Sequence, residues 1–210
     1  MFCAPKNSLL LCPFLPIFSS VLRVNCGCWL YIMKPSFFIS DVVKNYKQTR
    51  AFNKNGIIYT WEKYKELYKH VRNEKAIGDA SIGYLYKYDN SIPNIKKYLG
   101  DVKIILILRN PIEKAISQYN HLTSINAEPL SFKEAISEEE NRINECYPPL
   151  YHYISTSLYF NQVNAFKKNF SNVKIIFTQN LKSNPEQVLI ECCRFLGIDE
   201  IFEYNLKNLV

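Results

Sequence analysis

The chain has 210 residues, a formal net charge of +7 and an apolar share of 48%, which is ordinary for a globular protein. This length suits one domain with a sizeable core. The basic excess suits anionic ligands such as nucleotides or acidic glycans, and equally a merely soluble basic protein. No zinc-finger spacing, helix-turn-helix signal or basic-aromatic interleaving favours a nucleic-acid partner. Seven cysteines without a Cys-x-x-Cys pair give no reason to expect a metal or a dense disulfide framework.

Residues 1–29 form an atypical apolar segment. The stretch from Leu9 to Phe18 is apolar, contains two prolines and has no clear period. Because Lys6 precedes it, the segment could be a secretory signal or a signal anchor. A full membrane-spanning helix is less well supported, since Arg23 interrupts the apolar stretch and prolines disfavour a regular helix. A poorly ordered segment is the other reading. We therefore separate this segment from a domain of residues 30–210.

The next segments alternate between predicted strands and helices. Residues 30–38 indicate a short strand that ends in a proline-marked turn. Thr60 can cap a helix from Trp61 to about Val71. Asp79 follows as a candidate base or orienting group, although a turn carboxylate is the commoner role. A short helix from Pro93 to Gly100 leads to the centre of the chain.

The centre of the chain is a strand-turn-helix unit. Ile104 to Leu108 is an unbroken apolar run, as in a parallel strand buried on both faces. It stops at Arg109-Asn110-Pro111, where proline suits the first turn of a helix and asparagine its cap. The helical period that follows places Ser117 and His121 one turn apart. The apolar face of this helix is expected to contain Ile112, Ala115, Ile116, Tyr119 and Leu122.

This unit puts Arg109 at the carboxyl end of a buried strand, where open α/β sheets bind their ligands. Its planar fork of donors suits a phosphate, and Ser117 can donate a further hydrogen bond to the same anion. The alternative is a surface arginine and a serine with ordinary structural roles.

The remaining chain is predicted to be mostly helical. Ser131 opens a capping box for a helix through about Asn144, and the acidic run Glu138–Glu140 would be its solvated face. The segment Cys146–Tyr153 suits a mobile, acceptor-binding loop. The final predicted elements are a helix over 157–170, a buried strand over 173–177 and a helix over 183–197.

The central unit resembles the 3′-phosphate motif of the sulfotransferases, Leu-Arg-(Asp/Asn)-Pro-x-x-Arg-Ala-x-Ser-x-Tyr. The residues that carry the motif are Leu108-Arg109-Asn110-Pro111, Lys114-Ala115, Ser117 and Tyr119. Lys114 stands where the family has arginine. These enzymes use PAPS (3′-phosphoadenylyl sulfate), and the resemblance implies that Arg109 and Ser117 hold its 3′-phosphate. His121 matches a histidine near the reaction centre in the heparan-sulfate branch.

Other segments resemble the family in order and spacing. Residues 30–38 resemble Lys-Glu-Pro-His-Phe-Phe, with Lys34 in place of the glutamate that is the expected base. Ser157-Leu158-Tyr159 resembles Gly-x-Tyr, which makes Tyr159 a cofactor-binding candidate. The family's Pro-Lys-x-Gly-Thr-Thr loop holds the 5′-phosphosulfate on backbone amides and a lysine. Its counterpart at Ala4–Ser8 keeps Pro-Lys, so Lys6 is a further candidate. The family's C-terminal cofactor loop would lie past Val210.

The resemblance implies an α/β fold, a three-layer sandwich with a mostly parallel central sheet, similar to P-loop nucleotide kinases. No Gly-x-x-x-x-Gly-Lys-(Ser/Thr) loop supports ATP chemistry. The implied activity is in-line transfer of a sulfuryl group from PAPS to a hydroxyl or amine, with a carbohydrate as the expected acceptor. His121 and Lys34 would be catalytic, and no metal is expected.

Two other readings stay open. The altered loop and Lys34 favour a catalytically inactive sulfotransferase-like protein, or a truncated gene product that at most binds anionic ligands. A nucleotide- or sugar-nucleotide-binding transferase of similar architecture is the third reading. The compartment is also open: cytoplasmic for a bacterial enzyme, or the Golgi membrane if the apolar segment is an anchor.

Overall fold

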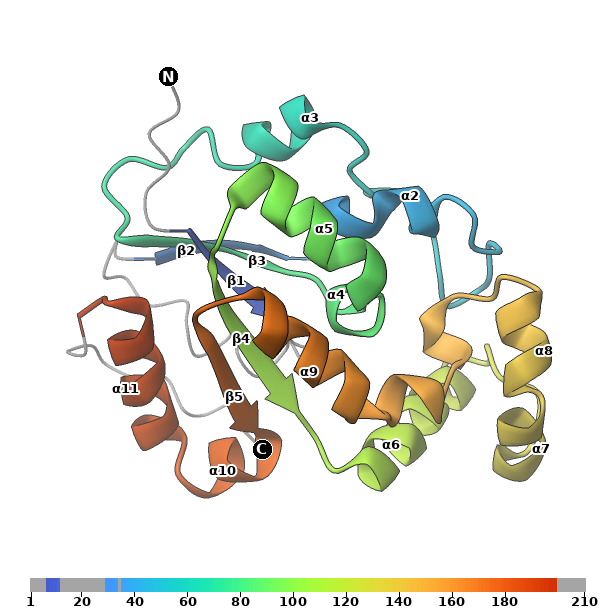
Figure 1. Cartoon of the computed structure of the whole chain (residues 1–210). Helices are drawn as coiled ribbons and strands as arrows, with labels where there is room; N and C mark the ends of the chain where they lie inside the picture. The colour runs from blue at the N-terminus through green and yellow to red at the C-terminus, as the bar shows by residue number, and fades with distance from the viewer. Residues whose placement is uncertain (1–6, 12–28, 34, 200–210) are drawn as a thin grey trace.

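A computed structural model describes residues 7–11, 29–33 and 35–199, with side chains from residue 35 onward. Figure 1 shows the arrangement of its elements. The strands are β1 (Asn7–Leu11), β2 (Trp29–Met33), β3 (Ala76–Ala80), β4 (Lys103–Leu108) and β5 (Val173–Phe177). The α-helices are α2 (Ser40–Val43), α3 (Trp61–Glu66), α4 (Gly83–Tyr86), α5 (Tyr88–Leu99), α6 (Pro111–Ser124), α7 (Phe132–Ser137), α8 (Glu139–Asn144), α9 (Tyr159–Asn169), α10 (Thr178–Ser183) and α11 (Pro185–Leu196).

The strands form one sheet in the order β2-β3-β1-β4-β5, and every neighbouring pair is parallel. Parallel neighbours need crossover connections, which the helices supply here. Because all strands run in the same direction, their carboxyl ends share one edge of the sheet. The pairing register places Leu108 opposite Phe177 at that edge. The predicted parallel α/β fold is confirmed.

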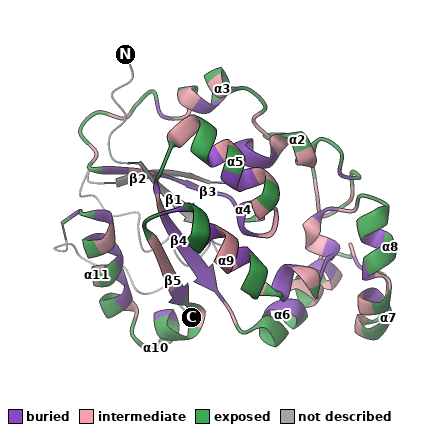
Figure 2. Cartoon of the chain, in the orientation of Figure 1, coloured by how far each residue is buried: buried purple, intermediate pink, exposed green. Residues whose placement is uncertain are grey.

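Helices cover both faces of the sheet. Figure 1 shows α5 and α9 on one side and α11 on the other. Strand β4 is buried along nearly its whole length, as Figure 2 shows, because helices cover both faces of the sheet. Ile104, Leu106 and Leu108 pack with α5 and α9. On the other face, Lys103 donates from Nζ to the carbonyl of Leu196 in α11. The sandwich therefore has the three layers that the sequence predicts.

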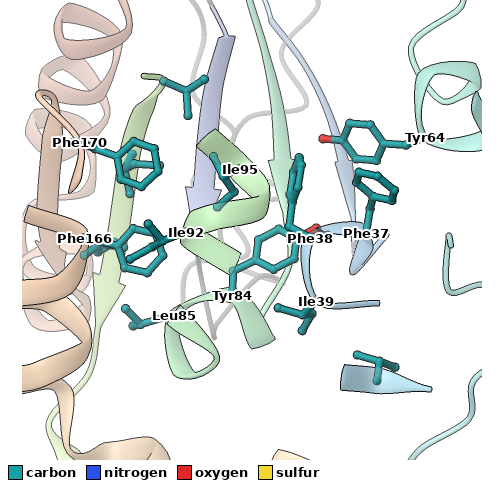
Figure 3. Close-up of a cluster of buried hydrophobic side chains, with 14 of the residues drawn as sticks. Phe37, Phe38, Ile39, Tyr64, Tyr84, Leu85, Ile92, Ile95, Phe166 and Phe170 are labelled. Atoms are coloured by element: carbon teal, nitrogen blue, oxygen red, sulfur yellow. Dashed lines mark hydrogen bonds between the residues drawn. The ribbon is translucent and has the colours of Figure 1, made fainter. Parts of the chain in front are cut away.

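The larger core is rich in aromatic side chains, drawn in Figure 3. Phe37 belongs to a short 3-10 helix, η1 (Phe37–Ile39), and stacks on Tyr64 at 4.8 Å between ring centroids. Phe38 meets the ring of Tyr84 edge-on at 5.5 Å. Such pairs add to the free energy gained by burying the rings. This core fixes the segment after β2 against α3 and α4, and so positions the carboxyl edge of the sheet.

Strand β1 comes from the apolar segment of residues 1–29, which is predicted to be separate from the domain. Its backbone pairs with β3 on one side and with β4 on the other, so Asn7–Leu11 lies inside the sheet. The division at residue 29 stays a prediction for the rest of that segment, because residues 1–6 and 12–28 lie outside the described residues. No described helix is long and apolar enough to cross a membrane.

Several element bounds differ from the sequence prediction. Helix α5 begins at Tyr88 and carries Pro93 within it. Ser131 makes the predicted capping box, but the following helix breaks at Glu138 into α7 and α8. Glu139 is buried, so the acidic run is not simply a solvated face. Its carboxylate accepts hydrogen bonds from the backbone amides of Ile154 and Ser155, which are distant in the sequence.

The helix α6 also departs from its predicted apolar face. Ala115 and Leu122 are buried, but Ile112 is 71% exposed and Ile116 is 43% exposed. The face that packs inward is instead rotated toward Lys114, which is only 5% exposed. This rotation results from tertiary packing. Backbone carbonyls of the loop before α9 face this side of the helix, and polar side chains of α6 donate hydrogen bonds to them.

Candidate active site

The candidate site is built at the carboxyl end of β4. The strand ends at Leu108, and Asn110 then caps α6 by accepting hydrogen bonds from the backbone amides of Ile112 and Glu113. Pro111 takes the first helical position, where its missing N–H costs nothing. Arg109 is therefore held between a buried strand and a capped helix, as predicted, at the edge where parallel sheets bind ligands.

One face of α6 carries the polar candidates. Arg109, Glu113, Ser117 and His121 follow one another at intervals of four, which aligns them along the helix. Arg109 Nε donates to Glu113 Oε2 at 3.2 Å, and the two side chains are 22% and 61% exposed. Ser117 is half-buried and His121 is exposed. This face therefore carries a guanidinium, a hydroxyl and an imidazole, each of which can donate a hydrogen bond to an anionic ligand.

Tyr159 opens α9, and its hydroxyl lies near Arg109. Its hydroxyl is buried and has no hydrogen-bond partner among the described residues. Burial raises the pKa of Tyr159 to about 12, and the neighbouring Arg109 works against that rise. A buried hydroxyl without a partner costs free energy unless a ligand or water meets it. The structure thus places the Tyr159 hydroxyl near Arg109.

The opposite side of α6 is tied to the loop before α9. Gln118 Nε2 donates to the carbonyl of Leu150 at 2.8 Å, with the carbonyls of Pro149 and His152 at 3.2 and 3.3 Å. Tyr151 and Tyr153 are buried as well. The segment proposed as a mobile acceptor loop is therefore an anchored part of the wall behind the site.

Lys114 forms the second tie. Its Nζ donates to Thr156 Oγ1, which donates in turn to the carbonyl of His152. Burial lowers the pKa of Lys114 to about 7, while the charge of Glu139 partly offsets that effect. Lys114 stands where the family motif has arginine. Its burial between a helix and a loop is a tertiary feature.

His152 is the third histidine of the chain, and no sequence motif assigns it a role. Its Nδ1 lies 3.2 Å from the Tyr86 hydroxyl, and its Nε2 is buried without a partner among the described residues. Burial lowers the pKa of His152 to about 4, so the ring is neutral at pH 7. Nearby, Glu139 accepts hydrogen bonds from the backbone amides of Ile154 and Ser155, at 2.7 and 2.8 Å.

Asp79 lies at the carboxyl end of β3 and is 1% exposed. It accepts hydrogen bonds from Ser81 Oγ at 2.9 Å and from the hydroxyls of Tyr84 and Tyr64 at 2.8 and 3.2 Å. Burial raises the pKa of Asp79 to about 7, against the effect of these three donors. The carboxylate therefore belongs to a buried hydroxyl cluster at the sheet edge, and does more than cap a turn.

Two predicted site residues, Lys34 and Lys6, lie outside the described residues. Lys34 follows β2, whose end lies at the same edge as Arg109. Lys6 precedes β1, whereas a phosphate loop in a sheet of this kind follows a strand. Both assignments stay predictions. Among residues 35–199 no cluster of histidine, cysteine or acidic side chains could hold a metal ion.

The parallel sheet and the arginine at its carboxyl edge define an open α/β architecture with a candidate anion site. Comparison with known families refines this: a model of the sulfotransferase domain matches residues 89–210, more than half of the chain. The matched region includes the whole strand-turn-helix unit from β4 to α6. The chain belongs to the sulfotransferase family.

Individual relatives agree with this assignment. The membrane-associated sulfotransferase kil1 of Dictyostelium discoideum is 31% identical over 153 residues, which are 69% of this chain and 32% of the relative. The bifunctional heparan sulfate N-deacetylase/N-sulfotransferase 3 of Mus musculus is 26% identical over 186 residues, covering 85% of this chain and 21% of the relative. The chain thus spans about a third and about a fifth of these proteins.

A solved structure matches the whole fold. The sulfotransferase from Alicyclobacillus acidocaldarius superposes with a TM-score of 0.85 at 28% sequence identity, covering 97% of this chain and 85% of that one. Because the match covers 97% of this chain, it includes the sheet and its helical layers.

Proposed function

We propose that this chain is a PAPS-dependent enzyme that transfers a sulfuryl group to a hydroxyl or amine of an acceptor, with a carbohydrate as that acceptor. The observation that carries the proposal is the placement of Arg109 at the carboxyl end of β4, with Ser117 on the same face of α6. Both lie in the part of the chain that matches the sulfotransferase family.

The residues present fit the 3′-phosphate of such a co-substrate. Arg109 offers a planar fork of donors, and its present partner Glu113 is mostly exposed and can give way to an anion. Ser117 adds a hydroxyl donor one turn beyond Glu113. Tyr159 brings a buried hydroxyl without a partner to the same place. These three side chains would hold the co-substrate, which supplies an activated sulfuryl group when bound.

The remaining candidates act on the acceptor side. His121 is exposed one turn beyond Ser117, so it would take up the acceptor proton or hold sulfuryl oxygens. Lys34 would neutralise developing charge, since an ammonium group is a poor base unless it is desolvated. Lys6 is a weaker candidate for the same task. Catalysis would come from positioning and charge stabilisation.

The relatives support the acceptor class. The mouse relative is named for N-sulfation of heparan sulfate, a glycan, which supports a carbohydrate hydroxyl or amine here. The Dictyostelium relative is named as membrane-associated, which supports a search for this chain in a membrane fraction.

A transfer assay tests the proposal. Purified protein is incubated with PAPS labelled in its sulfuryl group and with N-desulfated heparan sulfate, and label in the glycan is measured. We expect transfer by the wild type and an apparent KM for PAPS raised at least tenfold in Ser117→Ala, since a hydrogen bond to a charged group contributes about 1.5–3 kcal/mol.

Ser124→Ala is the matched control. Ser124 closes the same helix and bonds only the carbonyl of His121 among the contacts described for its hydroxyl, so its removal leaves the KM unchanged. A folded wild type that transfers no label to any hydroxyl or amine acceptor would favour the inactive sulfotransferase-like alternative. Equal effects of Ser117→Ala and Ser124→Ala would contradict the assignment of the co-substrate site.

A further inference from the structure

We propose that Asp79 is a positioning residue for the sulfuryl transfer: through the hydroxyls of Ser81 and Tyr84 it holds the backbone of residues 36–38 at the carboxyl edge of the sheet. The inference rests on the proposed function, because it assigns a part in that reaction. Its structural half, the hold on the backbone, can be measured without any activity.

The carboxylate is enclosed by hydroxyl groups. Asp79 Oδ1 accepts from Ser81 Oγ, and Oδ2 accepts from both Tyr84 and Tyr64. No ion pair with a basic side chain reaches Asp79 within residues 35–199. Burial of a carboxylate without a counter-charge lowers the free energy of unfolding, and an apolar residue at this position would destabilise the fold less. Such a group at a sheet edge points to a role besides stability.

Two of the three hydroxyls that donate to Asp79 also accept hydrogen bonds from the main chain. The backbone amide of Ser36 donates to Ser81 Oγ at 3.1 Å, and that of Phe38 donates to the Tyr84 hydroxyl at 3.5 Å. A hydroxyl has one proton. Because Asp79 accepts that proton from each hydroxyl, both oxygens turn their lone pairs toward the two amides. One carboxylate thereby fixes two peptide groups.

The backbone that is held needs such support. Ser36 has φ 50° and ψ 22°, in the left-handed region, which is unfavourable for a residue other than glycine. It lies immediately beyond Pro35, whose carbonyl accepts from the amide of Ile58. Pro35 follows Lys34 in the sequence, and Lys34 is the residue to which the proposed reaction assigns charge stabilisation. A shift of residues 36–38 would therefore also move Pro35, the residue that follows Lys34 in the sequence.

The third hydroxyl supplies a contrast. Tyr64 also donates to Asp79, but its other neighbour is the hydroxyl of Tyr68, which donates to the carbonyl of Gly78. This branch leads into the core and reaches no amide of residues 36–38. Tyr84 and Tyr64 are 0% and 3% exposed, so replacing either with phenylalanine removes one buried hydroxyl from a similar setting.

The test compares Tyr84→Phe and Ser81→Ala with Tyr64→Phe in the full chain. Hydrogen exchange at the amides of Ser36 and Phe38 is followed by NMR. The kcat and the KM for PAPS are measured, and the fraction of active protein is counted by stoichiometric binding of 3′-phosphoadenosine 5′-phosphate. We expect exchange at least tenfold faster and kcat about tenfold lower in Tyr84→Phe and Ser81→Ala, with the KM for PAPS unchanged, because small displacements at a reacting centre are costly.

In Tyr64→Phe the exchange rates and kcat should stay within about twofold of the wild type, since Ser81 and Tyr84 still accept the amides of Ser36 and Phe38. The inference is overturned if Tyr64→Phe lowers kcat as much as Tyr84→Phe, or if exchange at Ser36 and Phe38 does not respond to the loss of either hydroxyl. A wild type that binds the nucleotide but transfers nothing would instead refute the proposed function, and the exchange data would still decide whether Asp79 holds this backbone.

Discussion

Lys114 Nζ donates a hydrogen bond to Thr156 Oγ1 and so joins the inner side of α6 to the loop before α9. The outer side of the same helix carries Ser117 and His121. The position of the candidate site residues therefore depends on polar groups buried behind them. Gln118, which donates to carbonyls of the same loop, acts in the same way.

The first prediction concerns this buried lysine. The pKa of Lys114 is lowered from 10.5 to about 7 by burial, so the unfolded chain binds more protons between these values. The free energy of unfolding should therefore rise from pH 7 toward pH 10, by at most about 1.4 kcal/mol per pH unit. Urea unfolding at pH 7.5 and 9.5 measures the rise, which Lys114→Met should abolish and the exposed control Lys133→Met should retain. The same rise in Lys114→Met would contradict the burial of a neutral lysine.

A second pH effect comes from two groups with opposite shifts. Asp79 has a raised pKa of about 7, so its stabilising protonation is lost as the pH rises from 4 to 7. His152 has a lowered pKa of about 4, so its contribution is lost as the pH falls from 6.5 to 4. The two slopes oppose each other over pH 4–6.5.

Replacement of Asp79 should reveal the pH dependence that His152 contributes. In Asp79→Asn the free energy of unfolding should rise more steeply with pH between 4.5 and 6.5 than in the wild type, by up to about 1.4 kcal/mol per pH unit. Chemical unfolding across this range measures the slope, with exposed Asp41→Asn as the control. A slope in Asp79→Asn equal to that of the wild type would show that this carboxyl does not titrate in the range.

Glu139 should matter far more for stability than its neighbour in the same acidic run. Its carboxylate accepts two backbone amides, from Ile154 and Ser155, and it is buried, whereas Glu140 is exposed. We expect Glu139→Ala to lower the free energy of unfolding by about 2–3 kcal/mol, since two buried donors lose their acceptor. Glu140→Ala should change it by less than about 0.5 kcal/mol. Similar losses in the two variants, measured by urea unfolding, would count against the described contacts.

Glu113 should compete with an anion for Arg109. The two form an ion pair at 3.2 Å whose carboxylate is exposed, and such a pair contributes only about 0–1 kcal/mol to stability. Glu113→Gln removes the competing charge, so the affinity for 3′-phosphoadenosine 5′-phosphate should rise about two- to fivefold at low salt while the melting temperature stays the same. A weaker affinity in Glu113→Gln would mean that this carboxylate supports the site instead of competing within it.

Much of the fold is readable from local pattern. The apolar run of β4, the Asn110 cap and Pro111 at the first turn of α6 are all local signals, and the structure has each of them. Parallel pairing follows from such buried runs separated by helices. The motif that places Arg109 and Ser117 on one helix is local too, so this half of the site could be predicted.

The buried polar residues could not be predicted in this way. Glu139 sits among three glutamates, and only its loop partners distinguish it. One signal was present: Arg142, three residues later, is also buried and pairs with Glu128 at 2.5 and 2.8 Å. Charges three apart on a short helix can mark an inward face. His152 lacks even that signal, because its burial follows from long-range packing against Tyr86.

The most direct test of the proposed function is calorimetric binding of 3′-phosphoadenosine 5′-phosphate to the wild-type chain and to Arg109→Ala. This product carries the 3′-phosphate and needs no acceptor. We predict binding by the wild type and at least a tenfold weaker affinity in Arg109→Ala, because charge-assisted hydrogen bonds contribute about 1.5–3 kcal/mol each. Equal affinities, or no binding by a folded wild type, would contradict the assignment of this sheet edge to a nucleotide co-substrate.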